Sequence, residues 1–125
     1  MQTPRMVLTA TVLDAPDARQ LADFYARLLG WETEQSEEDW VVLRHPEGGP
    51  GLSFQTNGSY RRPSWPAGAD DQQVMVHLDI EVDDLEAAEA HAFAAGAVPA
   101  EVQPQEAVRV YVDPAGHPFC LWVAG

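Results

Sequence analysis

Two residue types in this chain combine reactivity near neutral pH with affinity for soft metal ions. They are one cysteine, Cys120, and four histidines, His45, His77, His91 and His117. A thiolate attacks electrophiles and binds soft metals, while imidazole moves protons near neutral pH and binds most transition metals. A nucleophilic Cys120 would need a nearby cation that lowers its pKa. The alternative is an inert, buried cysteine that packs as a small apolar side chain.

His77 is the histidine whose neighbours favour a binding site. It alternates with Asp79 and Glu81 along a predicted strand, so the three side chains share one face. If that face lines a cavity, the site is acidic and suits a cationic or polyhydroxylated ligand. If it faces water, the carboxylates contribute only to net charge. The alternative for His77 is a buried imidazole with a hydrogen-bond partner. We expect the other histidines to be solvated, two in turns and one on a helix edge (His45, His117 and His91).

The end of the chain predicts a β-hairpin. Val108 to Val112 alternates in polarity, Asp113-Pro114-Ala115-Gly116 has the composition of a tight turn, and Phe119 to Val123 is a buried apolar run. A weaker copy of this hairpin occurs earlier, with strands at Trp40 to Arg44 and Gly51 to Thr56. A hairpin that occurs twice indicates an internal repeat.

The segment before the first hairpin predicts a strand, a helix and a second strand. Met6 to Leu13 is rich in β-branched residues. Asp17 is the expected N-cap, with Gln20 at the capping-box position, and Gly30 follows the helix end. Trp31 to Thr33 is a short exit strand. The buried stripe of the helix consists of Leu21, Phe24, Tyr25 and Leu28.

The same order restarts in the second half. Val74 to Val82 is a predicted strand, and Asp83 with Glu86 predicts a second capped helix. Gly96 ends that helix, and Ala97 to Ala100 is its exit strand. The expected buried stripe is Leu85, Ala88 and Ala92.

These elements predict an α+β fold of two βαβββ modules, residues 6–56 and 74–123, within one domain of residues 1–125. Each module has a half-buried sheet, so the two need each other to close a core. The linker, residues 57–73, is rich in Gly, Ser and Pro and is long enough to have a function. Its Trp65 either covers a pocket or fixes its own loop.

Composition excludes several classes of partner. The net charge is −13, from 20 acidic and 7 basic residues, which opposes binding to nucleic acid or anionic membranes. A single cysteine suits a reducing compartment. Met6 to Leu13 is too short for a membrane span and lacks signal-peptide features. We therefore expect a cytoplasmic protein.

Three stretches resemble the vicinal oxygen chelate (VOC) superfamily, which includes glyoxalase I, bleomycin-resistance proteins and extradiol dioxygenases. They are Asp17 to Gly30, His77 to Asp84, and Asp113 to Cys120. The resemblance is strongest to the glyoxalase-like subgroup, which shares the His-Pro-Phe-Cys ending. It covers nearly the whole chain and implies two βαβββ modules forming an incomplete barrel around a ligand cavity, commonly in a homodimer.

The resemblance also implies where metal ligands would lie, on the first and last strands of each module. Those positions hold Ala10, Ser53 or Gln55, His77, and Cys120. Only His77 matches the family outright, because Ala10 has no donor and Cys120 replaces the usual Glu. We therefore expect no cofactor, with a divalent metal at His77 as the alternative. The glyoxalase I reaction is not expected, because its enediolate needs a firmly held metal and a base.

The resulting prediction is a glyoxalase-like protein that binds a small molecule in the sheet cavity. One alternative is a metal-dependent or Cys/His-based lyase, isomerase or dioxygenase. Another is a structural dimer without a ligand. The expected ligand-binding residues are His77, Cys120, Gln55, Ser53, Trp40 and Trp65. The expected partners are a small molecule and a second copy of the chain.

Overall fold

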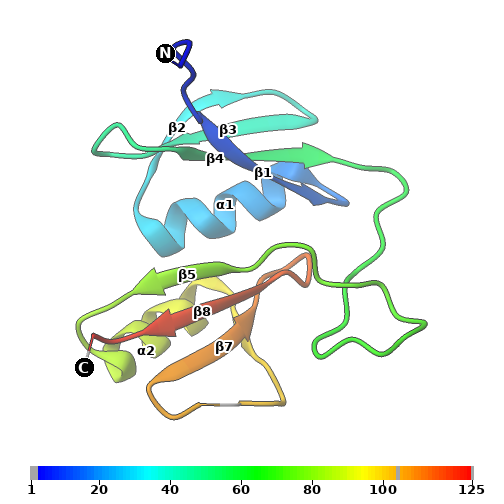
Figure 1. The fold of residues 1–125 in the computed structure, drawn as a ribbon, viewed down its shortest axis with the longest axis vertical. Coiled ribbons are helices and arrows are strands. Elements are labelled where there is room, and N and C mark those ends of the chain that lie inside the picture. The colour runs from blue at the N-terminus through cyan, green and yellow to red at the C-terminus, as the bar shows by residue number, and fades with distance from the viewer. Residues whose placement is uncertain (1–2, 104, 125) are drawn as a thin grey trace. The chain divides into compact units, whose positions relative to one another are not determined.

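The computed structural model describes residues 3–103 and 105–124 (Figure 1). The chain divides into two compact units, with the boundary between Asn57 and Gly58. Within the described residues, each unit contains one helix and one four-stranded sheet. We call the first unit the first module and the second unit the second module.

The first module contains β1 (Ala10–Ala15), α1 (Ala18–Leu29), β2 (Glu32–Ser36), β3 (Trp40–Arg44) and β4 (Gly51–Thr56). Its strand order is β1-β4-β3-β2. The first and last strands pair in parallel, while the two other pairs are antiparallel. Helix α1 lies along one face of this sheet (Figure 1).

The second module repeats this plan with β5 (Leu78–Glu81), α2 (Leu85–Ala95), β6 (Val98–Pro99), β7 (Val108–Val112) and β8 (Pro118–Trp122). Its strand order, β5-β8-β7-β6, is that of the first module. Ala10 pairs with Gly51 and Leu78 with Phe119, a separation of 41 residues in both modules. The prediction of an α+β fold with two βαβββ modules is confirmed.

The first helix begins and ends as the sequence predicts. Asp17 is its N-cap, and its carboxylate accepts hydrogen bonds from the backbone N–H groups of Arg19 and Gln20 at 3.0 and 3.4 Å. Gly30 adopts the left-handed conformation, with φ of 70°, which a residue without a Cβ adopts at little cost. The buried side chains of the helix are Ala18, Leu21, Ala22, Phe24 and Tyr25, and Leu28 is half-buried.

The prediction for the start of the second helix is wrong by one residue. Asp84, not Asp83, has the extended backbone of an N-cap, and its carboxylate accepts a hydrogen bond from Ala87 N–H at 3.1 Å. Glu86 matches the capping-box spacing from Asp83, but the helix begins at Leu85. Its fully buried residues are Ala92 and Ala95, while Leu85 and Ala88 are half-buried.

The first strand of each module is shorter than predicted. Strand β1 begins at Ala10 rather than Met6, and β5 begins at Leu78 rather than Val74. Each strand starts where its parallel partner offers a residue to pair with, Gly51 for Ala10 and Phe119 for Leu78. The apolar residues before these starts are not part of either strand. Met6, Val7, Leu8, Met75 and Val76 are exposed, and Val74 is half-buried.

The other strand predictions differ less from the structure. The bounds of β3, β4 and β7 are as predicted, and β8 begins and ends one residue earlier than predicted. The exit strand β2 extends to Ser36 rather than Thr33, while β6 contains only Val98 and Pro99.

The turn between β7 and β8 is fixed by Asp113. Its buried carboxylate accepts hydrogen bonds from the N–H groups of Ala115 and His117, at 2.9 and 3.0 Å. Gly116 has φ of 91° and closes the turn with a 2.9 Å hydrogen bond to the Asp113 carbonyl. The predicted Asp-Pro-Ala-Gly turn is therefore confirmed.

The loop that precedes β5 packs against this turn. The Tyr60 hydroxyl donates to the Ala115 carbonyl at 2.7 Å and lies 3.2 Å from His117 Nε2. Arg62 donates to the Pro114 carbonyl at 3.1 Å. The expectation that His117 is a solvated turn histidine is wrong, since it is half-buried and contacts Tyr60.

Neither helix in the described part of the chain has the length and apolar character needed to cross a membrane.

Candidate functional site

Pairing of β5 with β8 determines which side chains of the second module share a face. Asp79 pairs with Cys120, and Glu81 pairs with Trp122. Helix α2 covers the opposite face, where Phe93 and Glu89 of the helix contact Tyr111 of β7. Since side chains alternate along a strand, Asp79 and Cys120 lie on the face turned away from α2. We call this the open face of the second sheet.

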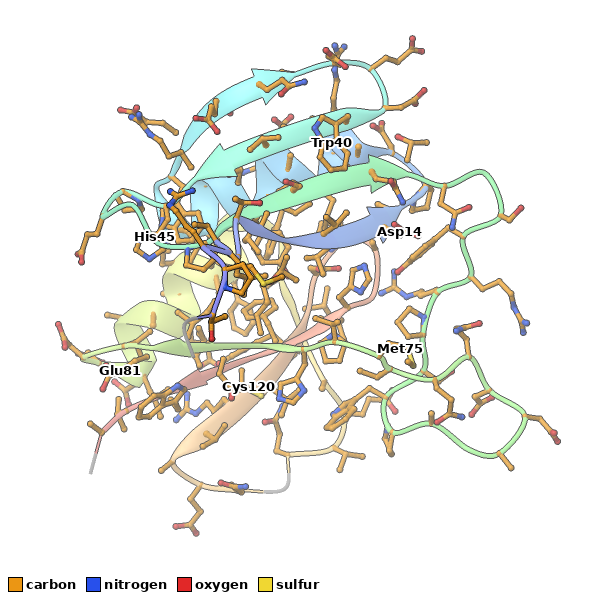
Figure 2. All side chains as sticks on the ribbon, turned by 45° about the horizontal axis from the view of Figure 1, so that its top comes forward. Asp14, Trp40, His45, Met75, Glu81 and Cys120 are labelled. Atoms are coloured by element: carbon orange, nitrogen blue, oxygen red, sulfur yellow. The ribbon has the colours of Figure 1, made fainter. Side chains whose placement is uncertain are left out.

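His77, Asp79 and Cys120 come together on the open face. One ligand atom from each of the three lies within 4.8 Å of the other two. His77 Nε2 is 3.5 Å from an Asp79 carboxylate oxygen. His77 and Asp79 are exposed, whereas Cys120 is 9% exposed. Figure 2 shows Cys120 on β8 and Glu81 at the end of the neighbouring β5. The family resemblance implies that the first and last strands of a module lie side by side, which predicts that His77 and Cys120 are neighbours, and the structure shows this proximity.

The surroundings of Cys120 do not activate its thiol. Burial raises the pKa of Cys120, and the negative charge of Asp79 and a hydrogen bond to Asp79 raise it further. A nucleophilic cysteine needs the opposite, a lowered pKa. The His77 imidazole does not supply that condition, so the geometry disfavours a Cys/His nucleophile.

The first module has a different set of residues at the equivalent positions. Val12 pairs with Ser53 as Asp79 pairs with Cys120, so Ser53 rather than Gln55 corresponds to Cys120. Ala10, two residues before Val12, corresponds to His77. Neither Ala10 nor Val12 has a side-chain donor atom, and Ser53 is 2% exposed. A metal site with ligands from both modules, as the family resemblance implies, does not fit these residues.

Gln55 and Trp40 lie on the face of the first sheet turned away from α1. They pair with each other across β3 and β4, and Gln55 also pairs with Asp14 across β1 and β4. The Gln55 amide donates to Asp14 at 2.9 Å, and the Asn57 amide donates to the other carboxylate oxygen at 3.0 Å. Asp14 and Trp40 are labelled in Figure 2. Sequence reasoning missed Asp14, although its place two residues after Val12 put it on this face.

Other predicted site residues stay predictions. Trp65 lies in the loop before β5 and is 37% exposed. Its contact with a ligand stays a prediction, and so do the ligand-binding roles of Ser53 and Gln55.

The expectation that His45 is solvated is wrong. His45 is half-buried, its ring lies 4.9 Å from the Trp31 ring, and it accepts a hydrogen bond from Glu47 N–H at 3.0 Å.

A hollow of about 510 Å³ lies elsewhere in the second module, on the α2 side of the sheet. Three of its polar side chains already have partners. Arg109 donates to Glu89 at 2.9 Å, and Gln103 bonds to the backbone of Ala100 and Val110. We assign no ligand to this hollow. Its lining residues are Glu89, Pro99, Ala100, Gln103, Gln105, Glu106 and Arg109.

Two βαβββ modules of identical strand order define a protein of the VOC superfamily. The family model described as "Glyoxalase-like domain" matches residues 10–122, and the chain belongs to this family. No curated protein matches the sequence.

Solved structures with the same fold are distant in sequence. A glyoxalase/bleomycin resistance protein/dioxygenase family enzyme from Burkholderia phytofirmans PsJN has a TM-score of 0.70 and 18% identity, covering 94% of this chain and 98% of that one. A glyoxalase-related enzyme from Fulvimarina pelagi has a TM-score of 0.67 and 16% identity, with coverages of 93% and 86%. A glyoxalase/dioxygenase from Nostoc punctiforme has a TM-score of 0.67 and 16% identity, with coverages of 94% and 90%. At these identities the likeness concerns the fold alone.

Proposed function

We propose that this glyoxalase-like protein binds a small molecule at the open face of the second sheet, through His77 and Cys120, and does not carry out the glyoxalase I reaction. The observation that supports this most directly is the cluster of His77, Asp79 and Cys120 on a face that α2 leaves uncovered. Few polar groups among apolar neighbours are typical of small-molecule sites. Val110, which pairs with Cys120, is such an apolar neighbour.

Charge favours a cationic or hydroxyl-rich ligand. Asp79 and Glu81 are exposed on the strand that carries this face, and the chain has a net charge of −13. An acidic surface attracts cations and repels anions such as phosphates. Trp65, in the loop before β5, supplies a further contact to the ligand, and the functional protein is a cytoplasmic homodimer.

The first module lacks metal-binding side chains at the positions where the family resemblance implies them, and this argues against the glyoxalase I reaction. That reaction needs a metal ion that stabilises an enediolate and a carboxylate-like base that moves the proton. Ala10 and Val12 cannot bind a metal, and Cys120 occupies the place of the usual carboxylate. The alternative function is a metal-dependent lyase, isomerase or dioxygenase, and the donor cluster of the second module is what favours it.

The test uses protein purified without a metal-affinity tag and kept in a chelating buffer, so that metal ions contribute nothing. Native mass spectrometry identifies a co-purified molecule, and calorimetry measures the binding of bleomycin as a cationic probe. His77→Ala should weaken binding by roughly 10- to 100-fold, which corresponds to the loss of about 1–3 kcal/mol from a hydrogen bond to the ligand that becomes buried on binding. His91→Ala is the matched control, since His91 is an exposed histidine on α2.

Two results would overturn the proposal. One is the absence of any co-purified molecule together with equal probe binding by the wild type and His77→Ala. The other is turnover of the methylglyoxal–glutathione adduct that depends on added zinc or nickel and is lost in His77→Ala.

A further inference from the structure

We infer that Asn57 is a site of spontaneous deamidation through the backbone nitrogen of Gly58, and that the Asp14 carboxylate slows this reaction. Asn57 and Asp14 belong to the first module, and Gly58 is the next residue along the chain. None of the three belongs to the proposed small-molecule site, so the modification is independent of that ligand. Asn57 is the single asparagine of the chain.

The Asn57–Gly58 pair has the chemistry of deamidation, which consumes only water. The Gly58 nitrogen loses its proton to hydroxide and attacks the carbonyl carbon of the Asn57 side chain, which closes a five-membered succinimide. The bond between that carbon and the amide nitrogen breaks, and ammonia leaves with a proton returned from water. Water then opens the ring at either carbonyl and leaves aspartate or isoaspartate. No group is oxidised or reduced, and the net exchange is a water gained for an ammonia lost.

The backbone at Gly58 is open enough for this ring to close. Gly58 is exposed, and a Cβ added to it would meet no heavy atom within 4 Å outside its chain neighbours. In the part of the chain that the structure describes, no group accepts a hydrogen bond from the Gly58 N–H. Strand pairing therefore does not hold the attacking nitrogen, and a residue without a Cβ rotates more freely than any other.

The Asn57 side chain, in contrast, is held at the end of the first sheet. Its amide donates to one Asp14 carboxylate oxygen at 3.0 Å, while the Gln55 amide donates to the other at 2.9 Å. The Asn57 backbone N–H donates to the Ala15 carbonyl at 2.9 Å, directly after the last residue of β4. A hydrogen bond to a carboxylate is stronger than one to a neutral acceptor. This bond must break when the amide turns towards the Gly58 nitrogen, so Asp14 slows ring closure.

Either product of the reaction changes the end of the first module. The carboxylate that replaces the Asn57 amide has no proton to donate to Asp14, so repulsion between two negative charges takes the place of the hydrogen bond. Isoaspartate also adds a methylene to the backbone, beside the hydrogen bond from Asn57 to Ala15. We therefore expect the deamidated protein to be less stable than the fresh protein.

The experiment follows the loss of Asn57 with time. Wild-type protein is incubated in warm, mildly alkaline buffer, folded in one sample and unfolded by urea in another. Isoelectric focusing detects the added negative charge, and mass spectrometry of the tryptic peptide 45–61 locates it. We expect conversion at Asn57 in both samples and faster conversion in the unfolded one. In folded Asp14→Ala the conversion should be about 5-fold faster than in the folded wild type, a factor that corresponds to about 1 kcal/mol.

Two variants are the matched controls. Gln55→Ala removes the other amide from Asp14 and should leave the rate within about 2-fold, since the Asn57 hydrogen bond stays in place. Gly58→Ala should react about 10-fold more slowly, because a Cβ restricts the backbone that must close the ring. Its fold should be unchanged, since Gly58 is not among the glycines with positive φ and has room for a Cβ.

Circular dichroism checks that each variant is folded. If Asp14→Ala does not fold, Asp14→Asn replaces it and should also react faster than the wild type, because a neutral acceptor holds the amide less tightly. A folded wild type that keeps Asn57 while the unfolded chain converts completely would overturn the site. Equal rates in the wild type and the folded Asp14 variant would overturn the role of Asp14. Asn57→Asp copies the aspartate product, and urea unfolding at the wild-type midpoint would overturn the expected loss of stability.

Discussion

Tyr111 of β7 and Glu89 of α2 are joined by a 2.9 Å hydrogen bond that links the second sheet to its helix. The Tyr111 hydroxyl donates to one carboxylate oxygen, while Arg109 donates to the other at 2.9 Å. Tyr111 is fully buried. Its burial, followed by the hydrogen bond to Glu89 and the negative charge of Glu89, raises the pKa of Tyr111 to about 12.

Stability should therefore fall in alkaline solution. A folded pKa of about 12 lies above the ordinary value of 10.0, so the unfolded chain loses the Tyr111 proton first. The stabilisation by neutral Tyr111 is fully present below pH 10 and is lost as the pH rises towards 12. Urea unfolding between pH 8 and pH 12 measures this loss. The loss of stability between pH 8 and pH 12 should be smaller in Tyr111→Phe than in the wild type. An equal loss in the two proteins would mean that groups other than Tyr111 cause it.

The corrected helix start gives a second prediction. Asp84→Ala removes the side chain that caps α2 and should lower the free energy of unfolding by about 1 kcal/mol. Asp83→Ala changes an identical residue one position earlier that does not cap the helix, and it should have an effect within about 0.5 kcal/mol. Chemical denaturation of both variants distinguishes the two positions. A larger loss of stability in Asp83→Ala than in Asp84→Ala would mean that Asp83 is the N-cap, as the sequence predicts.

Asp113 should be among the most sensitive positions of the second module. Asp113→Ala leaves the N–H groups of Ala115 and His117 without their acceptor in the turn between β7 and β8. Two such losses predict a destabilisation of roughly 2–4 kcal/mol. Asp113→Asn retains an acceptor oxygen and should cost less. Thermal unfolding ranks the two variants, and similar losses for both would mean that the negative charge matters more than the hydrogen bonds.

The protein is predicted to be a homodimer. Strands β1 and β2 are the edges of one sheet and β5 and β6 those of the other, and unpaired edges favour coverage by a partner. Apolar side chains are exposed just before two of these edges, including Met6 at 81% and Met75 at 84%. Light scattering at micromolar concentration should give twice the chain mass. Met75→Asp should weaken the dimer without unfolding the chain, whereas a monomer mass for the wild type would reject the prediction.

Local patterns in the sequence were sufficient for most of the fold. The cap at Asp17, the glycine after each helix and the two hairpins depend on neighbours a few residues away, and all were predictable. The start of β1 was not, because it depends on the position of Gly51 in a distant strand.

Prediction of the site had similar limits. Alternation placed His77 and Asp79 on one face, the family resemblance placed His77 near Cys120, and the structure adds that Asp79 also lies beside Cys120. Their spacing as three donors could not be read from a sequence, since it depends on how β5 pairs with β8. The contact of Tyr60 with His117 was missed because it joins residues 57 positions apart. From the composition of the turn alone, the His117 side chain was expected to be exposed to solvent.

The parallel pair that closes each sheet also determines when each module can fold during synthesis. Ala10 and Gly51 are 41 residues apart, so β1 has no partner until β4 has left the ribosome. Pairing across such a separation is slow to form, because a long loop must close before the first contacts are made. The first module becomes complete with Thr56, before any strand of the second module has been translated. Translation order therefore separates two sheets of identical strand order in time, which limits the pairing of β1 with β8 in place of β4.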